Sequence, residues 1–595
     1  MTTTTDRPVQ VPPERPVRRR RLRIPRPSHA LSAAVIIGLT VGVGYPLLQL
    51  VFEVSRGLGS GFETLLRVVR RDAFRDVVLN TLQFVVATVT LSVVLGFLLA
   101  LLIERTDIPV WRGIRRSLPM ISLLMPPLVG ALGWVYLFSP TAGLMNELFG
   151  SVGIPPFSIY SRPGIFLAGA VYLVPYAYSY ASAALQNMDG SHEEAARMSG
   201  ASPLKTLATI TIPAIRPALS GAILVTVMMS LAEISIPLIL GSGHGFSTLT
   251  LEIYRSVVGS YPSDLLTASV IGLCIAVVAL VGVSVQRRVI SKGSYATITG
   301  KPVHTTKVAL GPWRYPAVAF VWLYVAFAIV LPLGAVIYVG STKHWQPSIG
   351  AAEWSLEHFD KVFSTAQFRD SLWNSILLGL FSASAAIVFG VIISYAIVIL
   401  RMRRIGTLGD YVGNLPLGIP HIVFGLGLLL VLVNVHWIYG TLFALGLAYV
   451  ILFVPHAVRL ISASMRQVGN ELHDASHMSG ASDMTTLGRI TMPLVMPGVR
   501  AAWVLIAVLA FRELSASTLL STGANPVVSY VMVGVYQSGS VNNLAAFATC
   551  VAAINVGWLV VAGISARGRR PKRYRTGRKS PDLAGRMADP RTVAP

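Results

Sequence analysis

Two acidic residues, Glu233 and Glu513, lie inside long apolar stretches and are 280 positions apart. Their surroundings are similar, Leu231–Pro237 in one case and Phe511–Ser517 in the other. A carboxylate at membrane depth is costly, so it usually faces a pathway or a partner, where it can bind a cation, carry a proton or pair with a base. We therefore expect both acids to line a translocation pathway or its outer gate. The structural alternative is that each is locked in an ion pair, for example with Arg512, or caps a broken helix.

The chain lacks the motif that would let it use ATP itself. No Gly-x4-Gly-Lys-Ser/Thr phosphate loop occurs, and the glycine-rich stretch from Gly241 to Thr248 has no lysine. A phosphate-binding loop needs that lysine at a strand-to-helix junction. We expect no enzymatic activity, no cofactor and no metal site on this chain. The net charge of +23 does not indicate nucleic-acid binding, because many basic residues cluster in short segments between apolar runs, as in membrane proteins.

The composition is that of a membrane protein. Of the 595 residues, 53% are hydrophobic and 13% charged, and the mean hydropathy is +0.64. Soluble domains carry about 25% charged residues. Apolar runs of about 20 residues, the length needed to cross a bilayer, recur along the chain. We predict an all-α polytopic protein with twelve spans, placed at 30–53, 77–103, 117–138, 163–187, 214–240, 265–287, 315–340, 371–400, 412–434, 438–463, 496–520 and 544–565.

The two halves of the chain repeat one pattern. Pro126 and Gly133 recur as Pro420 and Gly427, both at an offset of 294. Six spans per copy return the chain to the side where it began, so the copies are parallel repeats, with a pathway expected at their interface. The excess of Lys and Arg in alternate connecting segments predicts that both termini are cytosolic. The basic segment 54–76 disagrees with this placement, and we expect an amphipathic helix there on the outer face. The predicted parts are a disordered basic N-terminus (1–28), a first half (29–287), a cytosolic linker (288–314), a second half (315–565) and a basic cytosolic tail (566–595).

A polar segment on the predicted cytosolic side occurs twice at an offset of 280. The five residues Met198–Ser202 are identical to Met478–Ser482. A single copy could be an ordinary turn between spans, whereas two copies at one spacing indicate a repeated functional element. The residues that define the segment are Glu194, Ala195, Ala196, Gly200 and Ile210–Pro213 in the first copy, and Asp474, Ala475, Ser476, Gly480 and Ile490–Pro493 in the second.

Each copy of this segment predicts two short helices. Ser191 and Glu194 have the spacing of a capping box, which predicts a helix start. Gly200 predicts the end of that helix, since glycine readily adopts a left-handed conformation. Ser202-Pro203 is typical of a second helix start. Ile212-Pro213 is expected to turn the chain back into the membrane, so that both short helices lie across the end of the bundle.

The same pattern of Glu-Ala-Ala, three residues, Gly, nine residues and Ile-x-Leu-Pro resembles the EAA motif of ABC importer permeases that depend on a binding protein. The sequence departs from the motif at Ile212 and Met492, which replace leucine, and at Asp474 and Ser476. The resemblance covers about residues 77–290 and 371–565. It implies the type I ABC importer permease fold with both permease halves in one chain, as in the ferric-iron, thiamine and aminophosphonate branches of the family.

In that family the short helix docks into a cleft on an ATPase subunit and transmits ATP-driven closure to the spans. The resemblance therefore implies two ABC ATPase subunits carrying ATP and Mg²⁺, an extracytoplasmic solute-binding protein, and a place in the bacterial inner membrane. The departures at Asp474 and Ser476 predict that the two docking sites are not equivalent. The coupling residues carried over by motif position are Glu194, Ala195, Ala196, Gly200, Asp474, Ala475 and Gly480.

The resulting prediction is an ATP-driven importer permease that moves a small solute by alternating access. Ferric iron is the first choice, because the fused halves and the surroundings of Glu513 resemble ferric permeases. Thiamine and 2-aminoethylphosphonate remain alternatives, and polyamine is more remote. An ion-coupled secondary transporter would also be polytopic and repeated, but it would not need the paired EAA segment. A scaffold protein would not explain the intramembrane acids.

Overall fold

The computed structural model describes residues 27–59, 66, 69–70, 72–110, 113–292, 307–400, 402, 408, 418–468 and 470–567. Residues 1–26 of the predicted disordered N-terminus, about half of the linker, parts of segment 54–76 and nearly all of the basic tail lie outside these ranges, while residues 27 and 28 begin α1. Those assignments, and the boundaries between the predicted parts, stay predictions.

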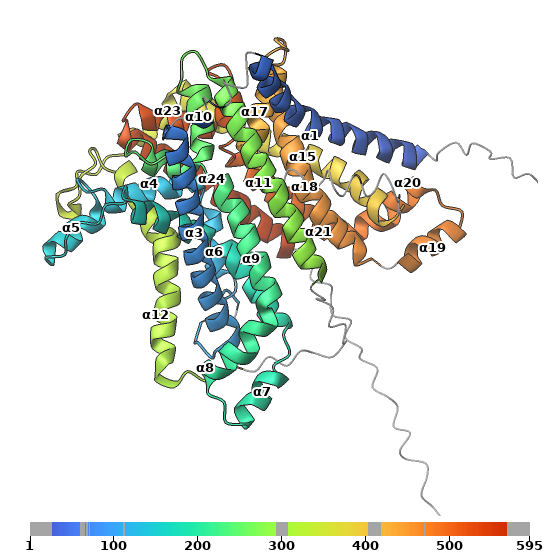
Figure 1. Ribbon diagram of the computed structural model, residues 1–595, viewed down its shortest axis with the longest axis horizontal. Helices are drawn as coiled ribbons and strands as arrows, with labels where there is room; N and C mark the ends of the chain where they lie inside the picture. The colour runs from blue at the N-terminus through green and yellow to red at the C-terminus, as the bar shows by residue number, and fades with distance from the viewer. Residues whose placement is uncertain are drawn as a thin grey trace, which may run out of the picture.

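The described chain is built from helices that follow one another in the same order in both halves (Figure 1). The first half comprises α1 (Pro27–Gly59), α3 (Asp72–Arg105), η1 (Leu118–Leu124), α4 (Pro127–Phe138), α5 (Leu144–Ser151), α6 (Arg162–Asn187), α7 (Ser191–Met198), α8 (Pro203–Thr206), η2 (Leu207–Thr211), α9 (Ile212–Ala232), η3 (Pro237–Gly241), α10 (Leu249–Val258) and α11 (Leu265–Lys292). The second half comprises η4 (Gly311–Trp313), α12 (Arg314–Val325), η5 (Ala326–Val330), α13 (Leu331–Gly340), η6 (Ile349–Ala351), α14 (Glu357–Ser364), α15 (Ala366–Val398), α17 (His421–Leu432), α18 (Leu442–Arg466), α19 (Asn470–Met478), α20 (Asp483–Thr486), η7 (Leu487–Thr491), α21 (Met492–Phe511), α22 (Ser517–Leu520), α23 (Val528–Gln537) and α24 (Val541–Arg567).

Ten helices in the described ranges are long and apolar enough to cross a membrane. The apolar helices α4 and α17, which lie within the third predicted span of each half, are shorter than these ten, so the predicted count of twelve spans is not confirmed. Residues 117–138 are divided into η1 and α4, because Pro126 and Pro127 lack the N–H groups that a continuous helix would use. The corresponding helix α17 begins after Pro420. At 12 residues each, α4 and α17 are about 18 Å long, less than the hydrocarbon core of about 30 Å.

Each half is organised around three packed spans. The helices α3, α6 and α9 pack together, and α15, α18 and α21 pack in the same way. Gly96 of α3 lies against Ala177 of α6, and Gly390 of α15 lies against Ala457 of α18, so the offsets found in the sequence correspond to equivalent places in space. Figure 1 shows the two three-helix groups running in different directions, with α7 and α8 at the end of one and α19 and α20 at the end of the other.

The first helix of each half packs against the other half. Helix α1 contacts α17, α15 and α18, and Ser28 Oγ at its start donates a hydrogen bond of 2.7 Å to Asp483 Oδ2 in α20. The segment before α12 runs beside the end of α3, where Leu310 N donates to Asp107 Oδ1 at 2.9 Å. Helices α12 and α13 then contact η1 and α4. Each half is therefore completed by a helix of the other.

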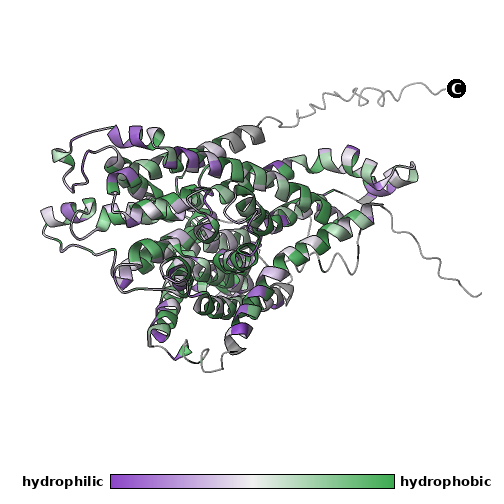
Figure 2. Ribbon diagram, turned by 90° about the horizontal axis from the view of Figure 1, so that it is seen from above, coloured by the Kyte–Doolittle hydropathy of each residue, from purple (hydrophilic) through white to green (hydrophobic). Residues whose placement is uncertain are grey.

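The outer surfaces of the helices are apolar. Figure 2 shows hydrophobic residues dominating the helices and hydrophilic ones gathered at helix ends and connecting loops. Val86 on α3 and Val388 on α15 are among the exposed large hydrophobic side chains. Apolar surface of this extent would be unfavourable in water and suits a lipid environment.

Candidate docking segments and intramembrane acids

The two polar repeats, which we call the first repeat segment (residues 191–213) and the second repeat segment (residues 470–493), have matching local structure. Gly200 ends α7 with a φ of +84°, and Gly480 follows α19 with a φ of +78°, which confirms the predicted helix ends. Ser202 Oγ accepts a hydrogen bond from Lys205 N at 3.3 Å, and Ser482 Oγ accepts one from Thr485 N at 3.2 Å. Both serines are therefore N-caps, as predicted.

Two local expectations are wrong. The residue that precedes α7 is Gly190, and Ser191 Oγ donates to Asp189 Oδ2 at 2.9 Å instead of capping the helix, so the capping box does not form. The second short helix is also not separate from the span. It continues through the π-helical turn η2 into α9, and Pro213 lies in the first turn of α9. Because a wider turn shifts the backbone hydrogen bonds, the missing N–H of proline is tolerated there.

The outward side of each repeat segment carries an exposed methionine. Met198 is 90% exposed and Met478, at the matched position, is 89% exposed. Of the motif residues, Glu194, Ala195, Asp474 and Ala475 are also exposed. An unbranched, polarizable side chain that adapts to its surroundings is common at protein-binding surfaces. Each repeat segment therefore presents a matched, exposed methionine next to a glycine turn.

The inward side of the first repeat segment is held by Glu193, a residue that the motif did not single out. Glu193 Oε2 lies 3.4 Å from Arg105 Nη1, and both side chains are buried. Glu193 Oε1 accepts a hydrogen bond of 2.6 Å from Thr211 Oγ1. In the second repeat segment His473 takes the place of Glu193, and its Nε2 lies 3.4 Å from Thr491 Oγ1. A comparison of the two copies position by position, instead of a search for identical residues, would have drawn attention to this site.

The Ser476 departure from the motif has a structural explanation. Ser476 Oγ lies 2.8 Å from Thr486 Oγ1, and both residues are buried. The first copy has Ala196 at this position, and within the described part of the chain the buried hydroxyl of Thr206 has no hydrogen-bond partner. Thr486 Oγ1 also donates to Ser482 O at 3.1 Å, so Ser476 gives this hydroxyl a second partner, whereas Ala196 in the first copy gives Thr206 none.

The reciprocal substitutions Ser476→Ala and Ala196→Ser should change the stability of their repeat segments in opposite directions. We expect Ser476→Ala to destabilise the second repeat segment by up to about 1 kcal/mol, because the buried Thr486 hydroxyl loses one of two hydrogen-bond partners and keeps Ser482 O. The reciprocal change Ala196→Ser supplies Thr206 with a partner and should be neutral or stabilising. Hydrogen exchange of the backbone amides in residues 191–206 and 470–486 measures both. Equal effects of the two variants would contradict the explanation.

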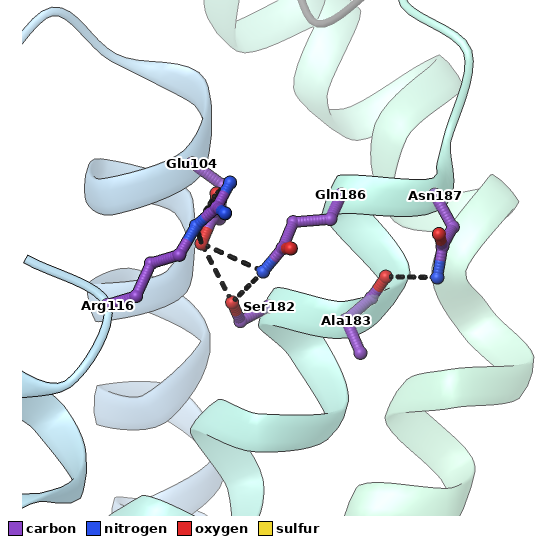
Figure 3. Close-up of polar contacts among 6 residues, drawn as sticks. All are labelled: Glu104, Arg116, Ser182, Ala183, Gln186 and Asn187. Atoms are coloured by element: carbon purple, nitrogen blue, oxygen red, sulfur yellow. Dashed lines mark hydrogen bonds and ion pairs between the residues drawn. The ribbon is translucent and has the colours of Figure 1, made fainter. Parts of the chain in front are cut away.

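A second buried carboxylate lies next to Arg105 at the end of α3. Figure 3 shows Arg116, Ser182 and Gln186 converging on Glu104. The Arg116 guanidinium donates to both carboxylate oxygens at 3.0 to 3.2 Å, Ser182 Oγ donates at 2.9 Å and Gln186 Nε2 at 3.1 Å. The charge is thus paired and hydrogen-bonded, as a buried carboxylate must be. Glu104 ties α3 to α6 and to the loop before η1.

The intramembrane acids both cap breaks in helices. Glu233 ends α9, and its Oε1 accepts hydrogen bonds from Ser235 N at 2.8 Å and Ile236 N at 3.2 Å. Glu513 follows the end of α21, and its two carboxylate oxygens accept from Ala516 N at 2.9 Å and Ser517 N at 3.0 Å. This is the geometry of the structural alternative, in which the acid caps a broken helix. A role in the pathway stays a prediction.

Arg512 connects the two halves. Its Nη1 donates a hydrogen bond of 2.8 Å to Leu123 O of η1 in the first half. It also interacts electrostatically with Glu233. Glu513 lies beside His421, whose Nδ1 is 3.7 Å from Oε1. Arg512 is thus a bridge between the halves.

The second repeat segment contains one pair of histidines, His473 and His477, with the i, i+4 spacing of helical metal ligands, a pattern that the sequence analysis did not identify. Among the described residues, no group of three or more His, Cys, Asp or Glu side chains gathers where it could hold an ion.

Comparison with known proteins decides the family. The family model described as "Binding-protein-dependent transport system inner membrane component" matches residues 92–292 and 386–570, which together are more than half of the chain. The chain belongs to this family. It is a multi-pass inner membrane permease of a binding-protein-dependent ABC importer, and as the membrane-spanning component it is not catalytic. The resemblance drawn from the EAA motif is therefore confirmed, including two permease halves in one chain.

Several curated proteins are similar to this permease. The ferric transport system permease protein FbpB of Actinobacillus pleuropneumoniae is 26% identical over 82% of this chain and 69% of its own length. The putative ferric transport system permease protein FbpB 1 of Haemophilus influenzae is 26% identical over 68% of this chain, but the match spans only 63% of that relative. The putative 2-aminoethylphosphonate transport system permease protein PhnU of Salmonella typhi is 28% identical over 40% of this chain and 82% of its own.

Among solved structures, a bacterial ABC transporter involved in the import of the acidic polysaccharide alginate aligns with 45% of this permease and 95% of its own chain. The identity is 20% and the TM-score 0.37. A similarity this low carries no weight for the fold or the substrate.

Proposed function

We propose that this permease moves a small solute, in the first instance ferric iron, from an external binding protein to the cytosol by alternating access. Two ATPase subunits drive the movement, one on each repeat segment. The observation that carries the proposal is the matched pair of exposed methionines, Met198 and Met478, beside the positive-φ glycines Gly200 and Gly480. Because α7 and α19 lie at the ends of separate helix groups (Figure 1), closure of two bound subunits would draw those groups together.

In this proposal both termini and both repeat segments face the cytosol. The start of α1 contacts α20 through Ser28 and Asp483, and the start of α12 lies beside the end of α3. These ends therefore share a side with the repeat segments. The bias of Lys and Arg toward these segments supports the cytosol as that side.

Ferric iron is favoured over other solutes by the breadth of the similarity. The FbpB relatives match about two-thirds or more of this chain, with 82% and 68% coverage. The alternative is 2-aminoethylphosphonate, which the PhnU similarity over 40% of the chain favours. Thiamine rests on the fused architecture alone.

The test is reconstitution of the whole importer. Tagged permease is expressed with the ATPase and the binding protein encoded beside it, and the purified complex is placed in liposomes. We expect the ATPase to co-purify. Radioactive ferric iron should cross the liposome membrane only when ATP is present on the side of the repeat segments and the binding protein on the opposite side. ATP-dependent uptake of labelled 2-aminoethylphosphonate or thiamine, with no uptake of iron, would replace iron as the substrate. Failure of the ATPase to co-purify, together with ion-gradient-driven uptake, would favour a secondary transporter.

A further inference from the structure

We propose that the buried Arg105–Glu193 pair is the mechanical link through which the first repeat segment moves α3. The two side chains are positioning residues, since they act on α3 and contact no substrate. The inference rests on the proposed function, because it assumes that an ATPase displaces α7.

The pair joins several elements at one point. Arg105 is the last residue of α3, and its Nη1 lies 3.4 Å from Glu193 Oε2 of α7. Its Nη2 donates a hydrogen bond of 3.2 Å to Met188 O, at the end of α6. Glu193 also accepts the hydrogen bond from Thr211 in η2. The ends of α3 and α6, the helix α7 and the start of the α9 span thus meet at one carboxylate and one guanidinium.

The pair is buried while the opposite side of α7 is exposed. Arg105 and Glu193 are 3% and 8% exposed, whereas Met198 is nearly fully exposed. Helix α7 has eight residues and in the described chain packs mainly against α8 and η2. A force applied to the exposed side therefore reaches α3 through Glu193. A buried ion pair resists separation, because a charge left without its partner in a low-dielectric site is strongly unfavourable.

In the second half the contact with a threonine is kept, while the two charged residues of the pair are replaced. His473 replaces Glu193 and keeps the contact with a threonine, as Nε2 lies 3.4 Å from Thr491 Oγ1. The position equivalent to Arg105, at the offset of 294 that relates α3 to α15, is Ile399. An isoleucine cannot form an ion pair. The contact with the threonine is thus common to both copies, while the residue types of the Arg105–Glu193 pair occur in the first copy and are replaced at the matched positions of the second.

The inference predicts that movement of α7 and movement of α3 can be uncoupled. Two pairs of spin labels report on them separately, after the free cysteines Cys274 and Cys550 are replaced by serine. The pair Ser199→Cys and Ser479→Cys follows the repeat segments, where both serines are exposed. The pair Val94→Cys and Val388→Cys follows α3 and α15 at equivalent exposed positions. Distances are measured by double electron–electron resonance on the permease–ATPase complex in nanodiscs, without nucleotide and with ATP, Mg²⁺ and vanadate.

In the parent complex we expect nucleotide to change both distances. In Glu193→Gln the change between 199 and 479 should remain and the change between 94 and 388 should be lost. The matched control is Arg116→Gln, which breaks the neighbouring ion pair of α3 with Glu104 but does not involve α7, and it should keep both changes. The double exchange Arg105→Glu with Glu193→Arg should restore the response of α3.

The outcomes separate the inference from the function on which it rests. If nucleotide does not change the 199–479 distance in the parent complex, the proposed docking function is wrong. If it does, and α3 still responds fully in Glu193→Gln, the link is wrong. Should Glu193→Gln not assemble with the ATPase, Arg105→Gln tests the same pair from α3. If neither assembles, the pair has a structural role only and the inference is overturned.

Discussion

Aspartate at both Met198 and Met478 is expected to abolish association of the permease with its ATPase. Burying a methionine side chain in an interface contributes roughly 1.5–3 kcal/mol, and an unpaired carboxylate in the same place is unfavourable. Since about 1.4 kcal/mol corresponds to a tenfold change in affinity, each single variant should weaken binding at least about tenfold. With two docking surfaces per permease, the double variant should retain little ATPase in a pull-down from detergent.

Both methionines are almost fully exposed, so aspartate should not disturb folding. The control is Leu148→Asp in α5, an exposed leucine on the predicted outer side, which should leave ATPase association unchanged. Comparing the two single variants then tests whether the docking surfaces are equivalent. Retention of the ATPase by the double variant would show that these residues are not at the interface.

The residues of the repeat segments that are identical in both copies could be predicted from the sequence. The turns at Gly200 and Gly480 and the caps at Ser202 and Ser482 follow from local chemistry that is independent of the rest of the fold. The predicted capping box does not form, because the Ser191 hydroxyl donates its hydrogen bond to Asp189, just upstream of the predicted cap.

The anchoring residues escaped prediction because they differ between the copies. Glu193 and Arg105 correspond to His473 and Ile399, so a search for identical residues at fixed offsets passes over them. A salt bridge between residues 88 positions apart also leaves no local signal in the sequence.

The packing of α1 on the second half could not be predicted either. An apolar run predicts a span, but it does not say which neighbour the span contacts. The break within residues 117–138 was not predicted, because hydropathy does not register that Pro126 and Pro127 lack a backbone N–H group. The intramembrane acids were found correctly, yet a pathway acid and a helix-capping acid produce the same sequence pattern.

Substitutions at Glu513 and Glu233 can separate those two roles. In Glu513→Ala the N–H groups of Ala516 and Ser517 lose their acceptors in a buried site. Each unsatisfied group costs about 1–3 kcal/mol, so we expect a marked loss of thermal stability and of uptake. Glu233→Ala removes the acceptor of Ser235 N and Ile236 N and should behave in the same way.

Glutamine at the same positions keeps an oxygen acceptor for the helix break and removes only the charge. If the acids serve the pathway, Glu513→Gln should retain most of the stability and still lower ATP-driven uptake by about tenfold, equivalent to about 1.4 kcal/mol on the transport barrier. Thermal unfolding of the purified permease and uptake into liposomes are measured on the same preparations. Normal uptake in both glutamine variants, with impaired folding in both alanine variants, would assign Glu233 and Glu513 to helix capping alone. Loss of uptake in Glu513→Gln but not in Glu233→Gln would place the functional charge beside His421, since that imidazole lies 3.7 Å from the Glu513 carboxylate.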